Sequence, residues 1–373
     1  KYTSDAMPTS LPSLFFPATV ALMLLCATAG FNLHHTSLRR PAVALRAGVS
    51  GDVFPLPLSA RRLLLVSSNS ELERSVGKFT PVGWSNRAGS VLTAVGTEIY
   101  TADRPFYWNK IDVGCRMTII RLESGGWFVH SPVALDDKLA AAIASLGGKV
   151  EHVVSPNYEH VKFASEWAEA YPNAKMWGCP GLSERMPEIK WEGDIPRSSG
   201  PGGSVLPEGM WDAEEVMPMH IDCELNPFNG KPFFNEVVFF HSKSGTLLTT
   251  DTFWNYPRDG GVNVEFQNAA AAAAAQDGEG ADYGTWELAP DVGPVPTGSA
   301  LWKFGMDKIF RPFYVRLMVG NRDSADEGRR KRFIALAEQM VYKWDVQTLI
   351  PAHGDIIRGR ELIRTVLAKH FDI

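Results

Sequence analysis

The sequence predicts a layered α/β domain that follows a targeting segment of about 90 residues. Two observations predict the α/β class. Short apolar runs alternate with alanine-containing helical patterns, and metal-binding types of side chain stand just past three of the runs. The chain has 373 residues, of which 45% are hydrophobic and 21% charged, and this balance is able to bury a core.

The composition argues against several classes of protein. The net charge is −5, the pI is near 6.0 and no basic run stands out, which argues against nucleic acid as the main partner. The four cysteines, Cys26, Cys115, Cys179 and Cys223, lie far apart without a Cys-x-x-Cys pair. We therefore expect neither a disulfide framework nor a cysteine zinc site, and a reducing compartment fits better.

The N-terminal segment has the composition of a two-part targeting sequence. Residues 1–30 contain an apolar stretch that Pro17 interrupts and that is short for a membrane span, so we expect a signal peptide; a membrane anchor is the alternative. In residues 31–90, the part Phe31–Ser70 is basic, rich in Ser and Ala, and has Asp52 as its one acid. This pairing resembles the targeting sequence of algae with complex plastids, and it predicts a plastid location.

From residue 91 to 373 the pattern predicts one domain of alternating elements. The turn Ser242–Gly245 joins two strands into a hairpin, and Gly147 and Gly148 stop a helix that begins with acids. Residues 258–300 are rich in Gly, Ala and Asp, and we expect a partly disordered surface insertion there. The predicted strands are 117–122, 127–130, 150–154, 175–177, 236–240, 246–250 and 346–350, and the predicted helices are 136–146, 161–170, 331–344 and 360–370.

Three apolar strands are each followed by side chains that bind metals. Glu159 and His160 follow the first strand, Asp251 the second and His353 the third. Strand ends in an α/β sheet meet along one edge, so these side chains are expected to converge. Two imidazoles and two carboxylates suit a single divalent metal, zinc or else Fe or Mn. His220, in a predicted loop ahead of the hairpin, is a further candidate ligand.

The order of these motifs resembles the metallo-β-lactamase fold, a layered αββα sandwich. The stretches DRPFYWNKIDVGCRMTIIRL, GGWFVHSPVAL, VSPNYEHVKFASEWAEAYPNAKMW and LIPAHGD are similar to an uncharacterised family of that fold, domain of unknown function 4336 of plants, algae and cyanobacteria. The similarity spans residues 97 to 373, with the insertion as extra material. It implies a metallo-hydrolase-like protein and names no substrate.

The resemblance also implies that only half of a two-metal site is present. The fold's turn reads His-x-His-x-Asp-His, and Ser155 and Asn157 stand at its first two His positions. The first metal site, which His220 would complete, is therefore expected to be lost. Counterparts of the second set remain, namely Glu159, His160, Asp251 and His353. At His130-Ser131 the fold usually has an Asp that orients a ligand, so that support is expected to be different or lost.

Each candidate has a structural alternative. His160 could begin a helix with its ring packed on Trp167 or Phe163, and Glu159 could be a solvated first-turn acid. Asp251 could cap a loop, whereas a packing role is hard to find for His353 between a strand and a Gly turn. His130, His152 and His241 are interpreted as structural.

A polar and aromatic run precedes these motifs. Arg104, Trp108, Asn109 and Lys110, with Tyr107, could bind a small anionic substrate, or the aromatic rings could pack on the sheet edge instead. With a metal, Glu159 or Asp251 would be the base in hydrolysis of an ester, thioester, lactone or phosphoester. The competing hypothesis is a catalytically inactive binding or assembly protein of the plastid. Redox chemistry at an iron centre is a third, weaker hypothesis.

Overall fold

The structure is a computed structural model that describes residues 91–104, 106–108, 111–112, 114–197, 205–256, 303–320 and 327–373. These residues belong to one compact unit. The predicted targeting segment and the whole predicted insertion (residues 258–300) lie outside the described residues, so both stay predictions. Among the described residues, no helix combines the length and the apolarity that a membrane crossing needs.

The first sheet has seven strands in the order β1-β2-β5-β6-β7-β8-β9. The strands from β1 to β6 pair antiparallel, and those from β6 to β9 pair parallel. β3 (Tyr107–Trp108) and β4 (Ile111–Asp112) form a separate antiparallel pair. The strands of the sheet are β1 (Thr93–Gly96), β2 (Ile99–Arg104), β5 (Cys115–Arg121), β6 (Trp127–His130), β7 (Val150–Ser155), β8 (Lys175–Gly178) and β9 (Gly193–Asp194).

The second sheet has five strands in the order β10-β11-β12-β13-β14. All of its pairs are antiparallel except β12 and β13, which run in parallel with Thr249 opposite Pro351. Since these two strands end at the same edge, the residues that follow them are brought together. The strands are β10 (Val216–His220), β11 (Val237–His241), β12 (Thr246–Thr249), β13 (Thr348–Pro351) and β14 (Ile357–Arg358).

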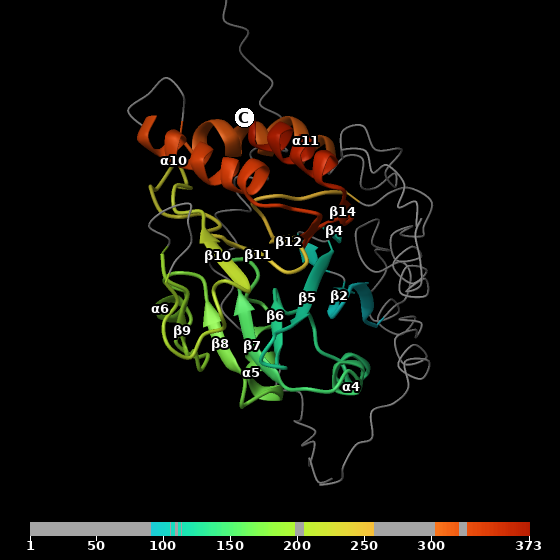
Figure 1. The fold of residues 1–373 in the computed structure, drawn as a ribbon. Coiled ribbons are helices and arrows are strands. Elements are labelled where there is room, and N and C mark those ends of the chain that lie inside the picture. The colour runs from blue at the N-terminus through green and yellow to red at the C-terminus, as the bar shows by residue number, and fades with distance from the viewer. Residues whose placement is uncertain are drawn as a thin grey trace, which may run out of the picture. The chain divides into compact units, whose positions relative to one another are not determined.

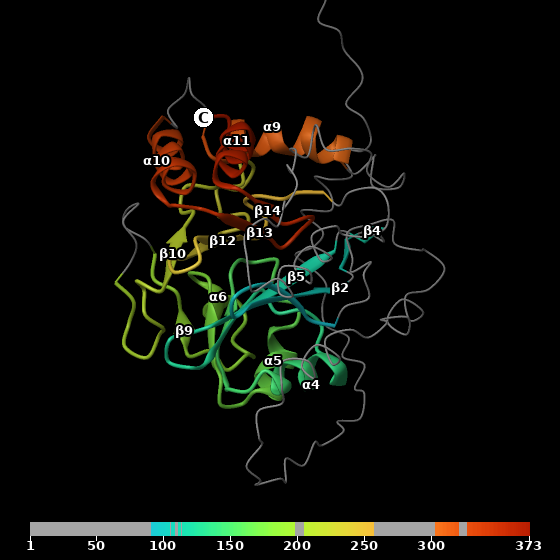
Figure 2. The same ribbon diagram turned by 45° about the vertical axis from the view of Figure 1, so that its right-hand side comes forward.

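Helices cover the outer face of each sheet. In Figures 1 and 2, α4 and α5 lie beyond the seven-stranded sheet, and α10 and α11 lie beyond the five-stranded sheet. This is the αββα sandwich that the sequence predicts. The helical segments are α4 (Asp137–Ser145), α5 (Ala164–Ala170), α6 (Leu182–Arg185), η2 (Met306–Phe310), α9 (Arg311–Phe313), η3 (Tyr314–Met318), α10 (Glu327–Glu338), η4 (Gln339–Lys343) and α11 (Arg360–Phe371).

Both faces of the central strands are buried. In β7, Val153 packs with the helices α4 and α5, while its neighbour Val154 packs between the two sheets against Phe239 and Leu248. Successive side chains point to opposite faces of a strand, so a strand covered on both sides becomes a continuous apolar run. A third apolar cluster joins the five-stranded sheet to α10 and α11. The three clusters make the layers one packed body and leave the strand ends as the place for polar side chains.

The predicted elements are found with small shifts of their ends. The helix predicted from Val161 begins at Ala164, and the strand predicted to end at Val154 continues through Ser155. The segment around His220 was predicted as a loop, but it is the strand β10, because it pairs with β11 and is buried. Other elements were not predicted, namely β1 to β4, α6, β9, β14 and the helical segment Met306–Met318.

Candidate metal centre

Three side chains meet where strands from both sheets end. His160 lies in the turn after β7 of the first sheet, while Asp251 follows β12 and His353 follows β13 of the second sheet. Their possible ligand atoms all lie within 4.8 Å of one another. The convergence expected from the strand ends is therefore present, although it joins two sheets rather than one.

Two imidazole nitrogens and both carboxylate oxygens of Asp251 have separations close to those in a tetrahedral metal site. His160 Nε2 lies 3.2 Å from His353 Nε2 and 3.3 Å from Asp251 Oδ2, and His353 Nε2 lies 3.4 Å from Asp251 Oδ1. Ligands held at zinc distances in a tetrahedron are roughly 3.3–3.6 Å apart. The three groups therefore fit one ion of the zinc, iron or manganese type, with a further position left for water or substrate.

The outer nitrogen of each imidazole is held by another group. His353 Nδ1 donates to the carbonyl oxygen of Gly114 at 2.7 Å, which leaves Nε2 with its lone pair toward the centre. His160 Nδ1 lies 2.7 Å from Ser131 Oγ and 3.7 Å from Cys115 Sγ. Such contacts fix the ring orientation and the tautomer of metal-binding histidines. The group that orients the ligand was expected to be different or lost at this position. It is different, because the Ser131 hydroxyl contacts His160 there.

Asn157 organises the turn that carries His160. Its amide nitrogen donates to Asp251 Oδ2 at 2.6 Å and to Thr250 Oγ1 at 2.9 Å. Its carbonyl oxygen accepts from the backbone N–H groups of Glu159 and His160 at 3.0 and 2.8 Å. All of these groups are used within the protein, so Asn157 positions the ligands and offers none for a first metal ion.

Two buried charged residues hold the other ligand loops. Glu236 accepts hydrogen bonds from three successive backbone N–H groups, those of residues 250, 251 and 252, at 2.6–2.7 Å. Arg116 forms an ion pair with Asp103 at 2.8 Å and donates to the carbonyls of Pro351 and Gly354 at 2.9 and 2.6 Å. The backbone on either side of Asp251 and His353 is therefore fixed by charge-assisted hydrogen bonds.

The electrostatics of the cluster favour an ionised Asp251. Burial alone would raise the pKa of Asp251, but His160 and His353 hold that pKa well below its usual range. Burial alone would lower the pKa of His160, but Asp251 and then Cys115 raise it well above the ordinary value. The carboxylate attracts positive charge to the point where the two Nε2 atoms meet, and either a proton or a metal ion supplies that charge.

Two predicted ligands lie outside this group. His220 is buried in β10, and its Nε2 lies 2.9 Å from Asn235 Oδ1. Glu159 is exposed as a residue, yet loss of hydration and then the Asp251 carboxylate raise the pKa of its carboxyl. His220 therefore makes a structural contact. Glu159 lies at the rim of the centre, close enough for the Asp251 carboxylate to raise its pKa.

The structure describes part of the predicted substrate-binding run. Arg104 is buried, lies 3.9 Å from Asp136 and donates to backbone carbonyls of Val91 and Asp103, so its visible contacts are structural. Asn109, Lys110 and the side chain of Trp108 lie outside the described residues, and their role stays a prediction. Phe106, from the same run, stacks on the His160 ring with centroids 6.4 Å apart.

Comparison with known families decides the affiliation of the chain. The sequence model of DUF4336, described as a domain of unknown function, matches residues 97–283. The chain belongs to the DUF4336 family. This match covers His160 and Asp251 and ends before His353, so the third ligand of the DUF4336 chain lies beyond it, although the resemblance was expected to reach residue 373. No curated protein matches the chain.

Solved structures with a similar arrangement include metallo-β-lactamases. The enzyme from Hirschia baltica is 10% identical with a TM-score of 0.43, and 75% of this chain and 96% of that one are covered. The Erythrobacter litoralis enzyme, with β-mercaptoethanol in its active site, is 10% identical with a TM-score of 0.45, covering 76% and 96%. The flavodiiron core of Flv1 from Synechocystis sp. PCC6803 is 11% identical, TM-score 0.45, covering 75% and 60%. With TM-scores below 0.5, the chemistry of this DUF4336 protein must be judged from its own side chains.

Proposed function

We propose that this DUF4336 protein is a metal-dependent hydrolase with a single metal ion held by His160, Asp251 and His353. The observation that carries the proposal is the set of three ligand-atom separations between 3.2 and 3.4 Å. A bound divalent ion would supply a water of lowered pKa and would polarise a carbonyl or phosphoryl oxygen. Zinc fits this set of ligands best, and iron or manganese is the alternative.

The residues around the site support a division of roles. Asp251 already accepts from Asn157 and contacts both imidazoles, so its oxygens are committed to the centre. Glu159 is exposed at the rim, and loss of hydration followed by Asp251 raises its pKa toward the range that suits a base. We assign Glu159 the acceptance of the proton from the attacking water, and we assign Asn157 the positioning of Asp251.

The rim also supports a negatively charged substrate. The Lys162 ammonium lies 5.1 Å from the centroid of Phe106 and 5.3 Å from that of Phe163, and Phe106 in turn stacks on His160. A cation held over aromatic faces beside the centre would attract a carboxylate or phosphate. We therefore propose a small anionic ester, thioester, lactone or phosphoester as substrate, and the plastid stays the proposed location.

The test compares the metal-loaded chain with two variants on nitrophenyl esters, an acyl thioester, a lactone and a nitrophenyl phosphate. One class should be hydrolysed above the rate in buffer, and chelation or His353→Ala should abolish the activity. Glu159→Gln should keep the metal and lower kcat by about 10²- to 10⁴-fold. Full metal occupancy without hydrolysis of any class would contradict the proposal and favour the binding-protein alternative.

A further inference from the structure

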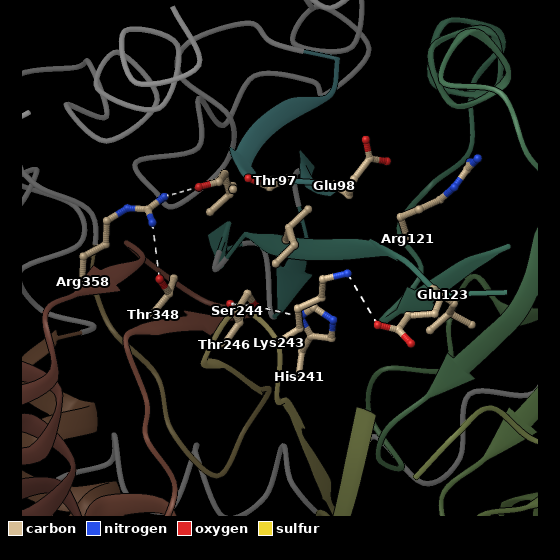
Figure 3. Close-up of a pocket in the computed structure, with 14 residues that line it drawn as sticks. Thr97, Glu98, Arg121, Glu123, His241, Lys243, Ser244, Thr246, Thr348 and Arg358 are labelled. Atoms are coloured by element: carbon tan, nitrogen blue, oxygen red, sulfur yellow. Dashed lines mark hydrogen bonds and ion pairs between the residues drawn. The ribbon is translucent and has the colours of Figure 1, made fainter. Parts of the chain in front are cut away.

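A pocket lies at the opposite ends of the strands that lead to the metal centre. Figure 3 shows it between the turns of the two sheets, with Glu98 and Arg121 from the seven-stranded sheet and His241 and Thr348 from the five-stranded one. Its volume is about 530 Å³, within the range of small-molecule sites.

The distance between the two sites follows from the strands they share. β12 begins at Thr246 in the pocket and leads to Asp251, and β13 begins at Thr348 in the pocket and leads to His353. At about 3.3 Å per residue, five residues of strand separate the two by roughly 16 Å. A small molecule in this pocket would therefore not contact the metal centre, although both sites sit on the same two strands.

The pocket contains a buried imidazole with a spare acceptor. His241 is 4% exposed, and its Nδ1 lies 2.7 Å from Ser244 Oγ, while Ser244 donates its own proton to Thr246 Oγ1 at 2.7 Å. Since that hydroxyl proton is used, His241 Nδ1 must be the donor to Ser244. Burial and then Lys243 lower the pKa of His241, so the ring is neutral. Its Nε2 is then an acceptor, and no described residue donates to it.

An exposed cation lies in the same pocket lining as this imidazole. Lys243 pairs with Glu123 at 3.5 Å, but both side chains are 71% exposed, so the pair is weak and opens easily. Across the pocket, the Arg358 guanidinium bridges the sheets by donating to Thr348 Oγ1 and to the Val95 carbonyl. In Figure 3, Lys243 and His241 lie together on one side and Arg358 lies on the other. The cations of the lining outnumber its acids, which favours an anion.

Part of the pocket lining is apolar. Ile99, Leu122 and Val95 contribute to its lining, and all three pack in the core between the two sheets. In small-molecule sites the apolar part of the lining contacts the ligand body and the convergent polar groups fix its orientation. The lining therefore fits a ligand that combines an apolar body, a hydrogen-bond donor and a negative charge.

We propose that this pocket binds a small hydroxylated carboxylate with an apolar body, whose hydroxyl donates to His241 Nε2 and whose carboxylate pairs with Lys243. The site is separate from the metal centre and does not depend on its activity. A buried acceptor that lacks a donor is costly, so a ligand that supplies the donor gains affinity over one that does not.

The test uses 3-hydroxybenzoate as probe in calorimetric titrations of the full chain. Benzoate lacks the donor and 3-hydroxybenzamide lacks the charge, and we expect each to bind roughly three- to tenfold more weakly. His241→Asn should weaken 3-hydroxybenzoate by a similar factor. Lys243→Gln, at an exposed position that should not affect folding, should weaken 3-hydroxybenzoate and leave 3-hydroxybenzamide unchanged.

His353→Ala is the control that separates the two sites. It should bind 3-hydroxybenzoate as the unmodified chain does, even where it has lost metal and hydrolysis. Absence of binding at millimolar concentration would overturn the proposal. Equal binding of all three probes, or binding that survives Lys243→Gln but disappears in His353→Ala, would overturn it as well.

Discussion

The hydroxyl oxygen of Ser131 lies 2.7 Å from Nδ1 of His160, on the side of the ring that faces away from Asp251. Ser131 is fully buried and has a φ of +55°, a left-handed conformation that costs energy in a residue other than Gly. A strained serine thus orients the proposed metal ligand His160 at the position where the resemblance led us to expect different or lost support.

Removing this hydroxyl should weaken metal binding without unfolding the chain. Groups that orient metal-binding histidines are worth about 10- to 100-fold in affinity, so Ser131→Ala should raise the zinc Kd by that factor. Cys115→Ala is the matched control, because its sulfur lies 3.7 Å from the same nitrogen and should matter less. Competition with a chromophoric chelator measures both, and an equal effect of the two variants would refute the role of Ser131.

Asn157→Ala should destabilise the turn as well as the centre. The amide makes four hydrogen bonds in a buried position, to the backbone of residues 159 and 160 and to the side chains of Thr250 and Asp251. We expect a loss of about 2 kcal/mol or more in the free energy of unfolding by urea. Asn229→Ala, an exposed turn residue that accepts from Lys231 N–H, should cost less than about 1 kcal/mol. Similar losses at both positions would contradict the account of Asn157.

These two residues mark the limit of sequence reasoning. The apolar runs predicted the main strands, and the polar residues after them predicted that His160, Asp251 and His353 converge, because both signals follow from local pattern and strand direction. The roles of Ser131 and Asn157 depend on backbone conformation and on contacts to residues up to 94 positions away, which the local pattern does not contain. The roles of Arg116 and Glu236 were missed for the same reason. From sequence alone a charged residue is expected at the surface, and only its partners show that it is buried.

The missed elements have a similar cause. β9 and β14 have two residues each, too few to show a period, and β10 contains Pro218, which weakens a strand pattern. The helical segment Met306–Met318 contains apolar and basic residues and also Pro312. Because proline usually interrupts a helix, the sequence pattern does not indicate one here.

Gly354 should not tolerate a side chain. Its φ is +80°, and a Cβ there would collide with the backbone of Asn255 and Tyr256. Gly147 has a φ of +69° with nothing within 4 Å of a Cβ, so Gly147→Ala measures the strain alone, about 1 kcal/mol. Gly354→Ala should cost about 3 kcal/mol or more in thermal unfolding and should lose metal, since the glycine follows His353 directly. Equal losses of stability in Gly354→Ala and Gly147→Ala would show that the turn at Gly354 has space for a side chain.

Glu224 should make the stability of the chain fall as pH rises. Burial raises the pKa of its carboxyl from the ordinary 4.5 to about 8. Between these values the folded chain keeps a proton that the unfolded chain has lost, so stability is highest below about pH 4.5. It declines toward pH 8 by about 1.4 kcal/mol per pH unit for this one group.

Glu224→Gln keeps an oxygen that can accept from the Phe234 N–H and removes the titration. Urea unfolding between pH 5 and 8 should therefore show a shallower decline for the variant than for the unmodified chain. Parallel declines would exclude Glu224 as the source.

The metal content of the chain distinguishes one metal centre from none or two. The full chain, purified without chelator and loaded with zinc, iron or manganese in turn, would be analysed by elemental mass spectrometry beside His160→Ala, His353→Ala and His220→Ala. We predict close to one metal ion per chain in the unmodified protein and in His220→Ala, and loss of the metal in both other variants. A folded chain that takes up none of the three metals, or two ions per chain with loss in His220→Ala, would contradict a single centre made by His160, Asp251 and His353.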